Sequence, residues 1–136
     1  MSNTIPLAKG QKAIQALFDV AGQDGKPPLA VAVVDRHGDL ICFARMDGAP
    51  VRTSLLAPNK AYTAARSERD TADLLKMIQD RRIDVAFFGD PRYCGLPGGL
   101  VVKDSAGLTV GGIGVSGRSS EEDHELGLIA LTICRP

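Results

Sequence analysis

The stretch from Gly95 to Gly117, GLPGGLVVKDSAGLTVGGIGVSG, decides the fold of this chain. Two apolar runs, Leu100 to Val102 and Leu108 to Val115, flank a turn that contains Lys, Asp, Ser and Gly. β-Branched residues favour strands, and clusters of Gly, Asp and Ser favour tight turns. The stretch therefore predicts a β-hairpin.

The second strand of this hairpin has two unlike faces, because side chains alternate along a strand. Ile113 and Val115 share one face. Gly112, Gly114 and Ser116 share the other face, which is almost bare backbone. Glycines inside a strand often mark the close approach of a ligand or of another backbone. The residues leave two interpretations open: the bare face is the floor of a small-molecule pocket, or a helix lies tightly across it.

The remaining chain predicts a second hairpin and several helices. LAVAVVD (29–35) and LICFARM (40–46) are strand-like and are joined by a short turn. Helical spacing of apolar residues predicts helices over 5–21, from about 53 to 66, from 70 or 71 to 82, and after Ser119. Residues 83–94 fit either a short strand or an extended loop. Strands joined by tight turns are antiparallel, so we expect one α+β domain over residues 1–136, with helices packed on an antiparallel sheet.

Two details of the helices matter for the site. In the 53–66 helix, Pro58 favours a start at Ala57 or Pro58, because proline is tolerated only near a helix start. In the same segment Ala57, Ala61, Ala64 and Ala65 form a stripe of small residues, which lets a helix lie close to a sheet. In the last helix, Ser119 and Glu122 have the spacing of a capping box.

Composition narrows the function. The 136 residues carry 16 basic and 16 acidic side chains, no Trp and six other aromatic residues, which argues against nucleic-acid and membrane partners. Three separated cysteines without a Cys-x-x-Cys pair predict buried thiols, a cytoplasmic protein and no metal centre. The start of the chain has no apolar signal core.

Three glycines spell the GxGxxG pattern of dinucleotide-binding proteins at Gly112, Gly114 and Gly117. That pattern belongs in the turn between a strand and a helix, and it needs a further strand with an acidic residue about 20 positions on. Here the first glycines lie inside a strand and only nineteen residues follow Gly117. We therefore do not interpret it as a nucleotide site.

Several polar residues are candidates for chemistry near the bare face. Asp123 and His124 have side chains that transfer protons, although acidic residues at a helix start also stabilise the helix dipole. Lys60 can hold a carboxylate or act as a base once it is desolvated, and Arg45 can pair with a ligand acid. His37 is expected to be exposed in a turn. If His37 were a haem or metal ligand, a second surface, such as one from another subunit, would have to complete the binding site.

The motifs VVDRHGDLICFARMDGAP, NKAYTAA, GLPGGLVV and VGGIGVSGRSSEEDHELG occur in this order and resemble the GlcG/HbpS family, which also forms the C-terminal domain of PduO. The resemblance covers residues 8–132. It implies a profilin-like sandwich that assembles from dimers into tetramers or octamers. The chain departs from the family pattern at Val101, where proline is frequent, and at Gly112, where alanine is frequent.

The resemblance also implies functional positions and functions. The family's marked residues within the expected ligand site are Arg45, Thr63, Gly98, Gly99, Gly114 and Ser116, and the expected catalytic residues are Lys60, Asp123 and His124. Members of the family include haem-binding proteins, a corrinoid-associated domain and hydroxylaminobenzoate lyases. We expect a small-molecule-binding protein, with lyase or isomerase activity on a small aromatic acid as one form. The alternatives are non-covalent haem or corrinoid binding and a ligand-free oligomeric scaffold.

Overall fold

The computed structural model describes residues 4–136, so residues 1–3 of the expected domain lie outside the described part. Four strands form one sheet in the order β2-β1-β4-β3, and every neighbouring pair is antiparallel. The strands are β1 (Ala30–Asp35), β2 (Leu40–Arg45), β3 (Gly99–Lys103) and β4 (Thr109–Ser116). Both predicted hairpins are present, and they meet where β1 pairs with β4.

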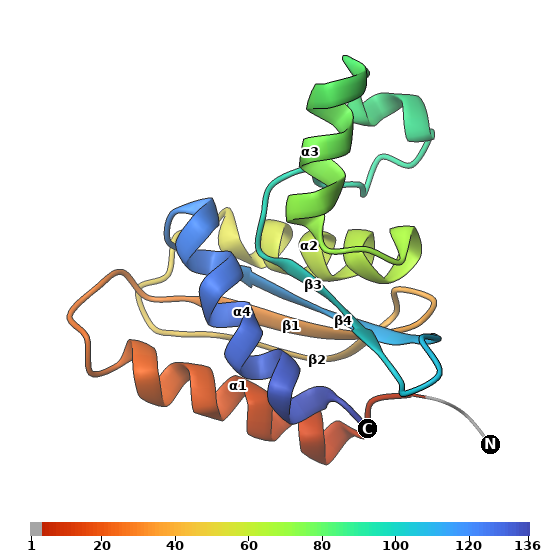
Figure 1. Ribbon diagram of the computed structural model, residues 1–136. Helices are drawn as coiled ribbons and strands as arrows, with labels where there is room; N and C mark the ends of the chain where they lie inside the picture. The colour runs from red at the N-terminus through yellow and green to blue at the C-terminus, as the bar shows by residue number, and fades with distance from the viewer. Residues whose placement is uncertain (1–3) are drawn as a thin grey trace.

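Helices cover both faces of the sheet, and the predicted α+β class is confirmed. Figure 1 shows α1 and α4 on one face and α2 on the other, with α3 projecting away from the sheet. The helices are α1 (Leu7–Ala21), α2 (Thr53–Ser67), α3 (Thr71–Arg81) and α4 (Ser120–Cys134), with a short 3-10 helix at Val85–Phe88. Ser119 accepts a hydrogen bond from the Glu122 amide at 3.2 Å, so the predicted capping box starts α4.

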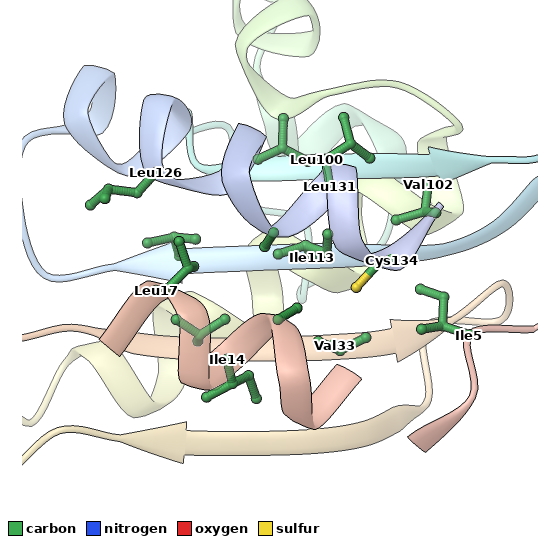
Figure 2. Close-up of a cluster of buried hydrophobic side chains, with 14 of the residues drawn as sticks. Ile5, Ile14, Leu17, Val33, Leu100, Val102, Ile113, Leu126, Leu131 and Cys134 are labelled. Atoms are coloured by element: carbon green, nitrogen blue, oxygen red, sulfur yellow. The ribbon is translucent and has the colours of Figure 1, made fainter. Parts of the chain in front are cut away.

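The main hydrophobic core lies between the sheet and the α1–α4 layer (Figure 2). Ile113 and Val115 point into it from the central strand β4, together with Leu100 from β3 and Val33 from β1. Leu17 of α1 and Leu131 of α4 complete this core from the helical layer. These branched side chains occupy the face that the alternation in β4 assigned to them.

The opposite face is packed by backbone and small side chains. Ala57, Ala61 and Ala65 of α2 are fully buried against Ala30, Ala32 and Val34 of β1. Because these residues are small, the axis of α2 can approach the sheet closely. The predicted alanine stripe is therefore the surface through which this helix packs.

Two local predictions need correction. The helix α2 begins at Thr53 rather than at Ala57 or Pro58, and Pro58 lies inside it. Residues 83–94 form no strand; they contain the 3-10 helix, whose first turn is capped when Asp84 accepts a hydrogen bond from the Ala86 amide at 2.8 Å. Pro58 is the sixth residue of α2 and lies beyond the four leading N–H groups that have no partner inside the helix, so the Ser54 carbonyl loses the helical donor that another residue would supply.

The segment from Thr71 to Pro97, which we call the arm, is attached to the body at its start, at Asp90 and at Cys94, whose amide donates to Thr63 Oγ1 at 2.8 Å. At its start, Thr71 Oγ1 and Asp70 Oδ1 accept hydrogen bonds from the amides of Gly99 and Val101, both at 2.9 Å, and thereby cover the free edge of β3. Further along, the hydroxyl of Tyr62 in α2 donates to Asp90 at 2.5 Å. Among residues 4–136, no helix has the length and apolar character that crossing a bilayer requires.

Candidate functional site

Two of the predicted catalytic residues form a buried ion pair. Lys60 of α2 and Asp123 of α4 meet where β4 ends and β3 begins, with Nζ 3.1 Å from Oδ2. Lys60 Nζ also donates to the carbonyl oxygen of Val115 at 2.9 Å, and Asp123 Oδ1 accepts from the Arg118 amide at 3.0 Å. Both side chains are only 2% exposed. The pair therefore joins the helices that lie on opposite faces of the sheet.

The groups around the Lys60–Asp123 pair exclude solvent and ligands from both charges. Burial raises the pKa of the Asp123 carboxyl above its usual value, and the positive charge of Lys60 opposes that rise. Gly98 has a φ of 122° and lies against the pair, where an added Cβ would be 2.8 Å from Lys60 Nζ. A substrate would therefore have to displace protein groups before it reached either charge. The catalytic roles of Lys60 and Asp123 stay predictions.

The bare face of β4 is not an open pocket, and the prediction that it is one is wrong. A Cβ placed on Gly114 would overlap the carbonyl oxygen of Ala57, and one on Gly112 would overlap that of Ala61. These contacts are between backbones, so no side-chain rearrangement relieves them. The alternative interpretation holds: α2 lies directly across the glycines.

The residues expected to bind a ligand are mostly engaged by the protein itself. Thr63 Oγ1 donates to the Asn59 carbonyl at 2.7 Å and accepts from the Cys94 amide at 2.8 Å. Gly99 lies under the backbone of Lys60, and Ser116 is buried at the end of β4. Arg45 is exposed on β2, level with Ser116 but two strands away. A ligand-binding role for these residues stays a prediction.

The third predicted catalytic residue, His124, is half-buried at the start of α4. Its Nδ1 is a buried polar atom without a hydrogen-bond partner in the described part of the chain. Asp70 is close enough for its charge to interact with this imidazole. Burial raises the pKa of Asp70, while a positive charge on His124 would lower it. Proton transfer by His124 stays a prediction.

An open groove of about 430 Å³ lies at the C-terminal end of α2, between the turns of the two hairpins. Its walls include Arg36, His37, Arg66, Glu68, Leu108 and Thr109. These residues come from three segments that are far apart in the sequence. The prediction that His37 is exposed is confirmed. The sequence did not predict that Arg66 shares a groove with it.

The turn that carries His37 is held in place by the protein. Asp35 Oδ1 accepts hydrogen bonds from the amides of His37 at 2.8 Å and Asp39 at 3.1 Å. Gly38, with a φ of 88°, packs so closely on α2 that a Cβ there would lie 2.5 Å from Cδ2 of Tyr62. This turn therefore presents the imidazole from a fixed backbone rather than from a free loop.

Both guanidinium groups of the groove lie close to His37. Arg66 Nη1 donates to the His37 carbonyl at 3.2 Å, and its guanidinium lies 5.3 Å from the centre of the Tyr62 ring. Arg36 Nε lies 3.4 Å from His37 Nε2. The acid in the same groove, Glu68, accepts a hydrogen bond from Thr109 Oγ1 at 3.0 Å. The groove thus combines an imidazole with two cations.

Two further grooves flank the ends of α4. One, of about 530 Å³, runs beside Val101 and the Asp70 that caps it, and its charges are mixed. The other, of about 350 Å³, lies over Leu126 and Ile129 beneath an acidic rim. Within residues 4–136, His, Cys, Asp and Glu side chains form no group of three that could hold a metal ion.

The fold defines a four-stranded antiparallel sheet with helices on both faces, and comparison with known proteins assigns it to a family. The model of the haem degrading protein HbpS-like family matches residues 5–132. The chain therefore belongs to the HbpS-like family, as its motifs predicted.

Three similar proteins show how broad the likeness is. A double mutant of Streptomyces reticuli HbpS superimposes with a TM-score of 0.86 at 30% identity, over 98% of this chain and 88% of that one. A complex of PduOC with haem gives 0.85 at 25% identity, over 98% and 99%. The corrinoid adenosyltransferase PduO of Salmonella typhimurium is 32% identical over 110 residues, which are 76% of this chain but 31% of PduO.

Proposed function

We propose that this protein binds haem non-covalently in the groove at His37, with the His37 imidazole as the metal ligand. The observation that carries the proposal is an exposed imidazole on a rigid turn, in a groove that two guanidinium groups also line. The match to the HbpS-like family and to the PduOC–haem complex supports the same ligand class.

The residues of the groove fit this group. Haem supplies an iron centre that accepts an imidazole nitrogen as an axial ligand. His37 Nε2 accepts a hydrogen bond from Arg36 Nε at 3.4 Å, so an iron that bound this nitrogen would replace the guanidinium there, and the exposed Arg36 side chain would turn away. Leu108, which is exposed, offers an apolar wall for the macrocycle. The chain has no Cys-x-x-Cys-His motif, so attachment would be non-covalent.

The direct experiment is a hemin titration of the wild-type protein and of two histidine variants, followed by the Soret band. We expect saturable binding by the wild type, loss of the imidazole-ligated spectrum in His37→Ala, and its retention in His124→Ala. His124 is the matched control because it is the second histidine of the chain. An unchanged spectrum in His37→Ala, or its loss in His124→Ala alone, would show that the ligand is elsewhere.

Self-association, which the resemblance implies, is part of the proposal. It is supported by large apolar side chains that the single chain leaves exposed on the arm and at the start of α2, among them Phe87 at 74% and Val51 at 82% exposed. Sedimentation velocity of the purified protein tests it. A species with twice the chain mass or more is expected, and a monomer at all concentrations would contradict it.

A further inference from the structure

The two arginines of the groove, Arg36 and Arg66, are not paired with carboxylates in the described part of the chain, and a metal-binding imidazole alone does not explain why they are there. Neither Arg36 nor Arg66 is within ion-pair distance of a carboxylate in residues 4–136, whereas Arg118 forms a two-point pair with Asp24. Arginine presents a planar fork of donors that matches a carboxylate. Two guanidinium groups of one groove are therefore without the carboxylate partner, among the described residues, that their planar arrangement of donors suits.

Resting on the proposed function, we infer that Arg36 and Arg66 form a carboxylate-binding subsite, and that this subsite selects a tetrapyrrole with free carboxylate side chains over one whose side chains are amides. Haem carries two propionates at its edge. The side chains of a cobinamide are uncharged amides. The groove therefore discriminates by the charge at the edge of the macrocycle as well as by the metal.

The protein holds one of the two forks in position before any ligand arrives. Arg66 leaves α2 in its last turn, donates one N–H to the His37 carbonyl and lies over the Tyr62 ring. Its other N–H groups remain available, since the His37 contact uses only Nη1. Arg36 is beside the imidazole itself. One cation thus contacts the backbone of the proposed metal ligand and the other contacts its ring.

Most acidic residues around the groove are hydrogen-bonded within the protein, and one of them, Asp90, accepts from the Tyr62 hydroxyl and lies close enough for its charge to interact with that of Arg66. Glu68 Oε1 accepts a hydrogen bond from Thr109 Oγ1, which directs this oxygen to the wall of the groove. Asp35 directs an oxygen to the amides of its own turn. Asp39 is exposed in that turn. Of the side chains that line the groove, two are permanently positive and one is negative.

The test compares three ligands: hemin, hemin dimethyl ester and diaquocobinamide, whose coordinated waters leave the metal open to an imidazole. The ester keeps the iron and the ring but removes both charges. We expect the dissociation constant to rise about tenfold on esterification, the size that two partly exposed charge-assisted contacts give. We expect no saturable binding of diaquocobinamide. Added salt should weaken hemin binding and leave ester binding unchanged, because salt screens exposed charges.

Variants separate this inference from the proposed function. Arg36→Gln and Arg66→Gln should each reduce the preference for hemin over its ester, while Arg69→Gln, which removes the same charge outside this groove, should leave it unchanged. Equal affinity of wild type for hemin and its ester would overturn the subsite but not haem binding. Absence of binding of both iron ligands would overturn both. Tighter binding of diaquocobinamide than of hemin would overturn the selection directly.

Discussion

The two surfaces of α2 differ in what they hold. The surface that faces β4 is closed by glycine against alanine, and beside it the charge of Lys60 is fully paired at 2% exposure. The C-terminal end of the same helix opens onto a groove, where Arg66 lines the wall beside His37 without a carboxylate partner among the described residues. Bare backbone thus marks the closed region of this molecule, and the open region is made by turns.

This comparison separates structural polar residues from those available to a ligand. A buried charge that is paired and hydrogen-bonded maintains the fold, because its partners satisfy it. An exposed imidazole on a rigid turn can accept a new partner at the cost of one exposed hydrogen bond, the one from Arg36. Lys60 and Asp123 belong to the first kind, and His37 with Arg66 belongs to the second.

The largest effect should come from filling the closed surface. Gly114→Ala introduces a Cβ that overlaps the Ala57 backbone, so α2 must move away from the sheet. We expect a loss of at least about 3 kcal/mol in the free energy of unfolding, or no folded protein, because the clash involves backbone in a packed core. Urea denaturation measures it.

Gly95→Ala is the matched control, because a Cβ there meets only Ile78 Cδ1 at 3.8 Å. It should unfold near the wild-type midpoint. A Gly114→Ala variant as stable as the wild type would mean that the face is open after all.

A smaller effect is expected from the buried pair. Lys60→Met leaves the Asp123 carboxyl buried without its cation. Because burial favours the protonated form of this carboxyl and the Arg118 amide still donates to it, we expect a loss of about 2 kcal/mol in the free energy of unfolding, below the roughly 3–5 kcal/mol that is typical of a broken buried pair. Adding Asp123→Leu should recover part of that loss, since the uncompensated charge is removed. Thermal and urea unfolding of the single and double variants give the coupling.

The control for this prediction is Lys76→Met. Lys76 pairs with Asp80 at 2.9 Å, but the side chains are 75% and 61% exposed, so the change should lie within about 1 kcal/mol. If Lys60→Met lowered the free energy of unfolding no more than Lys76→Met does, the Lys60–Asp123 pair would not stabilise the contact between α2 and α4.

The smallest effect concerns the contact between α2 and the arm. The hydrogen bond from Tyr62 holds the pKa of Asp90 below its usual value of 3.8. A lowered pKa in the folded state contributes stability above pH 3.8 that is lost as the pH falls through the folded-state pKa. Asp90→Asn should therefore lower the free energy of unfolding by about 1 kcal/mol at pH 6 and by progressively less below pH 3.8.

Unfolding of wild type, Asp90→Asn and Tyr62→Phe at pH 6 and pH 3 checks this. In Tyr62→Phe the carboxylate loses its donor, so replacing Asp90 in that background should change the pH dependence little. A difference between wild type and Asp90→Asn that grows as the pH falls would have the wrong sign for this account.

The sequence predicted the fold better than the site. Strand alternation assigned Ile113 and Val115 to the core, and the alanines of α2 were expected to let a helix lie close to a sheet. The glycine face of β4 and the alanine stripe of α2 pack against each other. Neither pattern alone predicts which element it contacts. Glycine signals close approach and leaves the identity of the approaching group open.

The site could not be predicted because it depends on topology. Lys60 and Asp123 are 63 residues apart and meet only once α2 and α4 lie on opposite faces of the sheet. The groove joins the turn at His37, the last turn of α2 and the turn before β4. The pattern DRHGD indicated an exposed histidine, and nothing local to it indicated that Arg66 lies alongside.

Hydrogen–deuterium exchange with and without hemin tests the central claim most directly, because it reads both surfaces of α2 in one experiment. At short labelling times we predict slower exchange in peptides that contain Arg36–Gly38, the end of α2 and Leu108–Thr109. Peptides around Gly98 and Asp123 should exchange as before. Protection confined to Gly98 and Asp123, with the His37 turn unchanged, would contradict the account.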